Sequence, residues 1–206
     1  MDRVRSEPPS TTFANGEYLV ARQHSIVVVR AYDERLASID MITVTIVCQI
    51  LLLAYHQVTT HVDFYPFNGA RNYSRGERLA EAGINLILMS LAPVGFVLHI
   101  HGLMIYGVVY YYFLFAAELI IWWIPYFTEP VAGSRVVYNF LLSCVTSDFS
   151  AGDALTRWYG TYKRLHGGTI VFLPSREGRP VPNVEHTILH AWTLVTAVTT
   201  TLAVFL

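Results

Sequence analysis

The stretch LAEAGINLILMSLAPVGFVLHIHGLMIYGVVYYYFLFAAELIIWWIPYF, residues 79–127, decides the fold of this chain. Its only charged residues are Glu81 and Glu118. As a single helix it would be roughly 70 Å long at 1.5 Å per residue, whereas the hydrocarbon core of a bilayer is about 30 Å thick. The stretch is therefore too long to cross once. It predicts two antiparallel membrane helices, 79–98 and 103–127, which form a hairpin around a short histidine-containing turn.

Two more apolar runs, at residues 36–58 and 187–206, complete the pattern. A membrane segment must satisfy its backbone hydrogen bonds internally, and each run is long enough to do so as a helix. The predicted fold class is an all-α integral membrane protein with four transmembrane helices and a long loop before the fourth. Its predicted parts are an N-terminal leader with an interfacial segment, a three-helix membrane region, the long loop and the last helix, at residues 1–35, 36–127, 128–185 and 186–206.

The composition of the chain agrees with this class, because 53% of the residues are hydrophobic and 14% are charged. The charged residues lie almost entirely between the apolar runs. A net charge of −1 leaves no basic surface for nucleic acid, which is therefore excluded as a partner. The chain has no Gly-x-Ser-x-Gly elbow, His-Glu-x-x-His helix or glycine-rich phosphate loop, so its motifs do not decide whether it is an enzyme.

Four crossings place the two ends of the chain and the histidine turn on one side of the membrane. The loops 59–78 and 128–185 lie on the other side, which we name the loop side. Positive residues near the helix ends favour the loop side as cytoplasmic and both termini as outside. Those on the terminal side are Arg22, Arg30 and Arg35, whereas those on the loop side are Arg71, Arg75, Arg78, Arg135, Arg176 and Arg179.

Three local features are predicted in the segments outside the spans. Apolar residues recur at helical spacing in 136–144, which indicates an amphipathic helix on the membrane interface. A short apolar patch at 26–29 is predicted to lie on the bilayer, and 169–173 is strand-like. Trp122 and Trp123, near the end of the third helix, are predicted to anchor it at the loop-side interface.

Polar residues within the predicted helices lie mainly in the loop-side half of the membrane. Gln49 and His56 are seven residues apart and share one face of the first helix, and His186 and His190 share one face of the fourth. Glu118 lies near the centre of the third helix. Because an ionisable group in hydrocarbon costs at least about 2.5 kcal/mol, Glu118 is expected to face the interior, to be protonated or to meet a cation.

Carboxylates and imidazoles on facing helices are typical ligands of a metal ion in a four-helix bundle. The predicted candidates for such a site are His56, Glu81, Glu118, His186 and His190. The alternative is that most of these histidines sit at the headgroup boundary and that only His190 is buried. His99 and His101 lie on the terminal side, too far away to join the same ion. A haem or chlorin would have to bind noncovalently, because no Cys-x-x-Cys-His occurs.

We expect this chain to function by associating with other membrane proteins, because it is small and rich in aromatic residues and lacks catalytic motifs. The expected role is an accessory or scaffold subunit of a larger membrane complex, with the lipid bilayer and a membrane-protein partner or further copies of the chain as its contacts. The alternative is a metal- or cofactor-binding membrane redox protein that uses the His/Glu cluster on the loop side. A further alternative is proton or ion translocation by an oligomer through Glu118.

Overall fold

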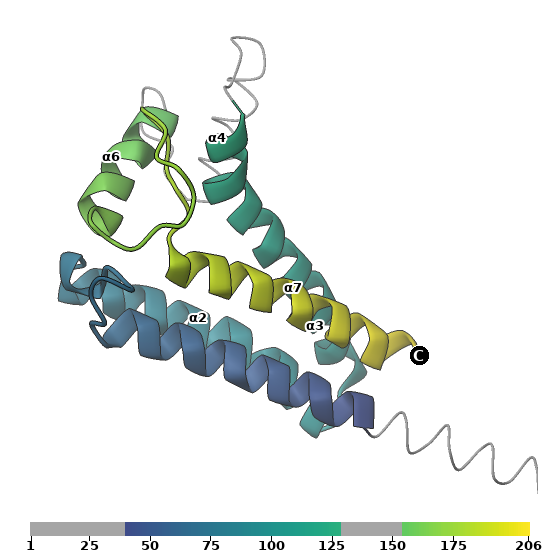
Figure 1. Ribbon diagram of the computed structural model, residues 1–206. Coiled ribbons are helices and arrows are strands. Elements are labelled where there is room, and N and C mark those ends of the chain that lie inside the picture. The colour runs from purple at the N-terminus through teal and green to yellow at the C-terminus, as the bar shows by residue number, and fades with distance from the viewer. Residues whose placement is uncertain (1–39, 129–153) are drawn as a thin grey trace, which may run out of the picture. The chain divides into compact units, whose positions relative to one another are not determined.

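The computed structural model describes residues 40–128 and 154–206, in which helices are joined by irregular segments and no strand occurs (Figure 1). Four helices are long and apolar enough to span a membrane: Asp40–His61, α2 (Arg75–Val97), His101–Phe127 and α7 (Val184–Phe205). The predicted class, an all-α membrane protein with four spanning helices, is therefore confirmed. All contacts discussed below lie within the compact unit of residues 42–206.

The second and fourth helices begin before the apolar runs that predicted them, because polar residues cap them. Ser74 and Glu77 form a capping box in which the Ser74 hydroxyl accepts from the Glu77 N–H and the Glu77 carboxylate accepts from the Ser74 N–H. The Asn183 side chain caps α7 by accepting from the N–H of His186. The first helix also continues beyond its predicted end at Val58.

The third span contains two changes of helix type. It consists of α3 (His101–Glu118), a π-helical turn η2 (Leu119–Trp123) and α4 (Ile124–Phe127). Such π turns inside α-helices often accompany functional sites, because they rotate the side chains that follow. Here the turn comes directly after Glu118 and contains two tryptophans.

Close packing of α3 against its neighbours α2 and α7 depends on small residues. A Cβ atom on Gly95 would lie 2.5 Å from the Cβ of Leu103, and one on Gly107 would lie 2.9 Å from the Cβ of Ala92. Both distances are shorter than carbon atoms tolerate. The buried apolar core drawn from the four spans consists of Leu52, Met89, Ala92, Tyr111 and Ala197.

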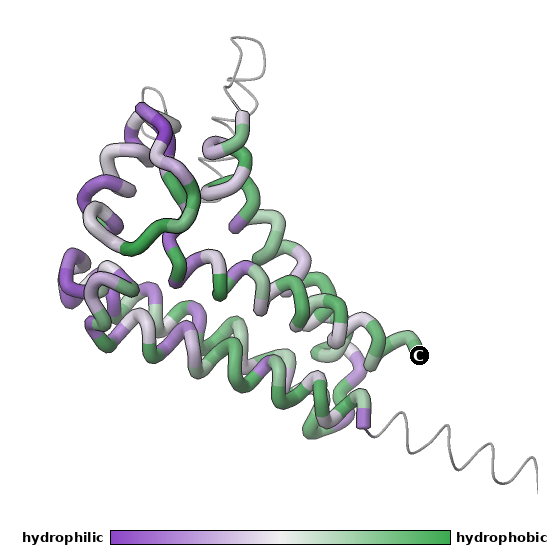
Figure 2. Tube along the Cα trace, viewed as in Figure 1, coloured by the Kyte–Doolittle hydropathy of each residue, from purple (hydrophilic) through white to green (hydrophobic). Residues whose placement is uncertain are grey.

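The buried face of α7 is largely polar. Thr193, Thr196 and Thr200 on this face are fully buried. The amide of Gln49 donates to the Thr200 hydroxyl over 3.1 Å, which ties the first helix to α7. Hydrophobic residues run along the four long helices, whereas hydrophilic ones gather around α6 and the neighbouring loop (Figure 2). This arrangement suits a bundle surrounded by lipid, in which polar groups turn inward.

Two loops lie with α6 (Ala154–His166) at one end of the bundle, the loop-side end. They are residues 62–74, which contain the short 3-10 helix η1 (Ala70–Asn72), and the irregular segment 167–183. The N–H of Ile170 donates to the carbonyl of Pro66, and the N–H of Val184 donates to the carbonyl of Ile170, both over 2.9 Å. These isolated bonds do not build a ladder, so the strand-like assignment of 169–173 is wrong. The two bonds instead connect Ile170 to the first loop and to the start of α7.

Pro125 explains how α6 attaches to the third span. Pro125 has no N–H, so it cannot donate to the carbonyl of Ile121 four residues earlier. The indole N–H of Trp158, on α6, donates to this carbonyl over 2.9 Å. The carbonyl of Ile121 in the spanning helix is thereby the point at which α6 docks.

Several predicted features lie outside the described residues. They are the N-terminal leader, its apolar patch at 26–29 and the amphipathic helix at 136–144.

Candidate metal centre

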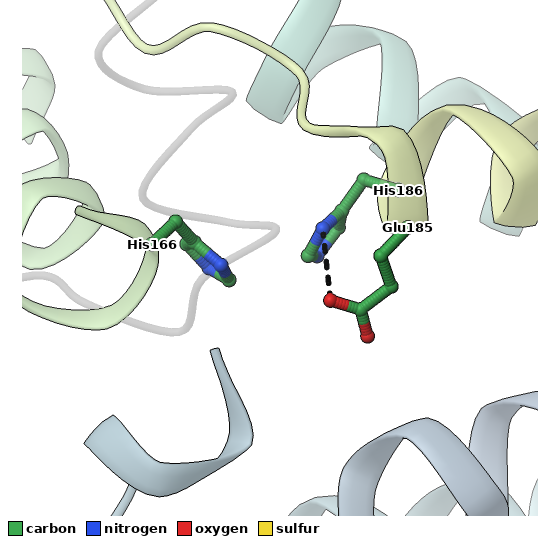
Figure 3. Close-up of side chains that lie close together, drawn as sticks. All are labelled: His166, Glu185 and His186. Atoms are coloured by element: carbon green, nitrogen blue, oxygen red, sulfur yellow. Dashed lines mark ion pairs between the residues drawn. The ribbon is translucent and has the colours of Figure 1, made fainter. Parts of the chain in front are cut away.

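The candidate centre is formed where the start of α7 meets the end of α6. Glu185 and His186 belong to the first turn of α7, and His166 is the last residue of α6. One ligand atom of each of these three residues lies within 4.8 Å of the other two. Figure 3 shows the His166 and His186 rings turned toward each other, with the Glu185 carboxylate beside His186. We name these three residues the loop-side triad.

The hydrogen bonds of His186 identify which of its nitrogens is available to a cation. The Asn183 Oδ1 atom accepts from the backbone N–H of His186 over 2.9 Å, which identifies that atom as oxygen. The same oxygen lies 2.7 Å from His186 Nδ1, so Nδ1 must carry the proton. The lone pair of the neutral ring is then on Nε2, whereas the Glu185 carboxylate lies 3.8 Å from the protonated Nδ1 (Figure 3). This pairing of a histidine with a carbonyl oxygen is the usual support for a metal-binding imidazole.

His166 is held by Tyr73, whose hydroxyl lies 3.1 Å from Nε2. His166 is 3% exposed, and its Nδ1 has no hydrogen-bond partner among residues 40–128 and 154–206. Burial, assisted by the positive charge of Arg164, lowers the pKa of His166 to about 4, so the ring is neutral at pH 7. A cation would bind at Nδ1, and the Nε2–H would then donate to the Tyr73 oxygen.

The phenol of Tyr73 is suited to that supporting role. Burial raises its pKa far above the ordinary value, with a further contribution from the nearby carboxylates Glu81, Glu185 and Glu77. The hydroxyl therefore stays neutral at any physiological pH.

Two residues of the triad, Glu185 and His186, line a small cavity of about 30 Å³, which is room for an ion or a water molecule. His56 and Glu81 line this cavity together with Glu185 and His186. His56 Nε2 lies 3.6 Å from the Glu81 carboxylate. The cavity therefore brings together three of the five sequence-predicted candidates: His56, Glu81 and His186.

His190 has a different environment, although it lies one turn from His186. The indole N–H of Trp123 donates to His190 Nδ1 over 2.8 Å. An indole nitrogen can only donate, so a neutral His190 carries its proton on Nε2. His190 could bind a cation only after that hydrogen bond breaks.

Glu118 lies deeper in the bundle, where Thr193 is its partner over 2.9 Å. Thr193 is seven residues beyond His186 on α7, which is roughly 10 Å along the helix axis. Glu118 is 7% exposed, so it faces the interior, as predicted. The described partner of the Glu118 carboxylate is Thr193, so Glu118 lies apart from the loop-side triad.

Comparison with protein-family models, curated proteins and solved structures gives no match for the chain.

The ring of Trp122 packs against three histidines, His166, His186 and His190. It is 4% exposed, so its predicted role as an interfacial anchor is wrong. Its ring centroid lies 4.2 Å from that of His186, and the further rings around it are Trp158, Tyr162, His166 and His190. The docking of α6 covers Trp122 with protein in place of lipid headgroups.

Sequence reasoning missed His166 and Glu185. Glu185 was placed at the end of the loop, whereas the Asn183 cap puts it in the first turn of α7. α6 was not predicted because it is polar and contains Gly160. Ala154, Trp158 and His166 recur at intervals of four or eight residues, and this spacing is the signal that could have identified a helix with His166 on its packed face.

Proposed function

We propose that this chain is a metal-binding membrane protein that holds a divalent transition-metal ion at its loop-side end. The observation that carries the proposal is the convergence of two neutral imidazoles and a carboxylate in the loop-side triad. Two histidines and one carboxylate are a ligand set that suits Zn²⁺ or Fe²⁺. The proposal follows the metal-binding alternative, with His166 and Glu185 as ligands that the sequence did not suggest.

The surroundings of the triad support the proposal through hydrogen bonds. Asn183 orients His186 and Tyr73 orients His166. Such partners fix the rotation and the tautomer of metal-binding side chains and raise metal affinity.

Three protein ligands leave a coordination position for water or a substrate oxygen, and a bound ion would supply Lewis acidity there. Because Glu81 and His56 line the adjacent cavity, they are the groups placed to exchange a proton with whatever occupies it. We therefore propose the triad as the binding centre and the His56–Glu81 pair as its polar neighbour.

Elemental analysis tests the proposal. The protein would be purified in mild detergent with a tag free of histidine, and then incubated with Zn²⁺ or with Fe²⁺ under nitrogen. We expect about one ion per chain, most of which is lost in His166→Ala and His186→Ala. His101→Ala is the matched control, because His101 is exposed and begins α3 at the far end of the span. Absence of metal from the unaltered protein, or an equal loss in His101→Ala, would overturn the proposal.

The accessory-subunit hypothesis remains a prediction. Copurification from native membranes in mild detergent tests it, and a chain that is recovered alone would count against it.

A further inference from the structure

A second, apolar hollow lies next to the polar cavity. It is a groove of about 430 Å³ between the first helix and α7, a volume in the range of small-molecule sites. Its walls include Leu51, Ala54 and Val58 from the first helix, and Ile188 and Trp192 from α7. Among the described residues that line it, only Tyr55, Thr59 and Trp192 carry side-chain hydrogen-bonding atoms.

The groove and the polar cavity meet at Thr59, which lines both. Tyr55 also lines the groove, and its hydroxyl donates to the backbone carbonyl of Glu185 over 3.0 Å. On α7, Ile188 lines the groove and the next residue, Leu189, lines the cavity. The apolar groove therefore adjoins the polar cavity at Thr59 and lies next to the residues of the proposed metal centre.

The outer side of the groove faces the hydrocarbon of the membrane. Leu51 and Val58 are each 47% exposed, and Ile188 is 40% exposed, although all three belong to spanning helices. Trp192 is fixed by a hydrogen bond from its indole N–H to the carbonyl of Cys48. A ligand that enters this groove from the bilayer would meet an ordered wall.

We propose that the groove binds the acyl chain of a single-chain amphiphile whose compact head reaches the polar cavity beside the metal ion. The cavity of about 30 Å³ is too small for a phosphocholine head, so the head that reaches it must be a compact group such as a carboxylate. A carboxylate oxygen is also a natural ligand for the open coordination position. The ligand class is therefore that of a long-chain fatty acid. This inference rests on the proposed function, because the head would lie next to the bound ion.

Electron paramagnetic resonance with spin-labelled lipids tests the inference. Zinc-loaded protein would be reconstituted in phosphatidylcholine vesicles that contain either a spin-labelled stearic acid or a spin-labelled phosphatidylcholine. The immobilised fraction of each label gives its association with the protein. We expect a roughly fivefold preference for the fatty acid, the ratio that about 1 kcal/mol produces.

Two matched variants locate the binding. Ala54→Phe fills the groove and should reduce the ratio to about one, whereas Ala116→Phe places the same ring on an exposed position of α3 outside the groove and should leave it unchanged. An equal preference in Ala54→Phe and the unaltered protein would overturn the inference. So would equal association of the two labels with the unaltered protein, which would indicate annular lipid only.

Elemental analysis of the same vesicles separates this inference from the proposed function. Full zinc content without a fatty-acid preference contradicts the groove and leaves the metal centre standing. Absence of zinc contradicts the metal centre itself. A preference that is equally strong in zinc-loaded and chelator-treated protein would show that the head does not meet the ion, and would overturn the inference as stated.

Discussion

Asn183 accepts two hydrogen bonds from His186, one from its backbone N–H and one from Nδ1, over 2.9 and 2.7 Å. One side chain thus starts a membrane helix and fixes the tautomer of a proposed metal ligand. Asn183 therefore both caps α7 and orients the His186 ring, so a substitution at this position affects both.

Substitution Asn183→Ala should lower metal affinity by about 10- to 100-fold, the usual effect of losing the partner of a ligating histidine. It should also destabilise the start of α7 by about 1 kcal/mol. Asn183→Asp should keep most of the affinity, because a carboxylate accepts from the same two donors. Competition with a chelating dye measures both variants, and unchanged affinity in Asn183→Ala would refute the orienting role.

The docking of α6 can be tested through Trp158. Trp158→Phe leaves the Ile121 carbonyl without its indole donor, which should cost about 1–3 kcal/mol. The destabilisation caused by Trp158→Phe should be smaller when it is combined with Pro125→Ala, because the alanine restores a backbone N–H to the span. Limited proteolysis within α6 reports the docking, with Tyr159→Phe on the same helix as the control. Equal protection in Trp158→Phe and the unaltered protein would refute this account of α6.

Packing between α2 and α3 makes Gly95 sensitive to substitution. Gly95→Ala brings a Cβ atom to 2.5 Å from Leu103 Cβ and 2.9 Å from the Leu103 carbonyl carbon. We expect a destabilisation of about 1–3 kcal/mol from overpacking. Gly83→Ala in the same helix is the control, since no packing neighbour among the described residues lies within 4 Å of its added Cβ. Thermal unfolding in one detergent compares the two, and equal effects would contradict the close contact.

The carboxyl group of Glu118 is expected to be protonated. Thr193 Oγ1 lies 2.9 Å from Glu118 Oε1 and 3.0 Å from the carbonyl of Leu189, yet the hydroxyl has one hydrogen to donate. A protonated Glu118 satisfies both contacts by donating to the hydroxyl. Infrared spectroscopy should therefore show the carbonyl band of a carboxylic acid that disappears in Glu118→Gln. A band that is absent from the unaltered protein would refute the assignment.

The same variant tests the proposed translocation through Glu118. If the oligomer conducts protons by this route, flux into liposomes should fall in Glu118→Gln, because an amide cannot release a proton. Unchanged flux would remove this residue from any such path.

The spans could be predicted because long apolar runs have few solutions in a bilayer. Their exact starts depended on single polar side chains, Ser74 and Asn183, whose capping bonds extend the helices beyond the apolar residues. Trp122 was misplaced for a related reason. Sequence position put it at the interface, but the contact made by α6 covers it.

The candidate site was predictable only where ligands share a helix. The spacing of His186 and His190 suggested a common face, yet His190 is paired with Trp123 and the partner of His186 in the triad is His166. That partner comes from a polar helix separated from α7 by an irregular segment. No spacing rule connects residues on different elements, so this part of the site required the tertiary structure.

X-ray absorption of the metal-loaded protein tests the central claim most directly. For Zn²⁺ we predict two imidazole nitrogens and carboxylate oxygen at about 2.0–2.1 Å, with one imidazole lost in His166→Ala and another in His186→Ala. A spectrum without imidazole scattering, or one that neither substitution alters, would contradict the assignment of His166, Glu185 and His186 as a metal centre.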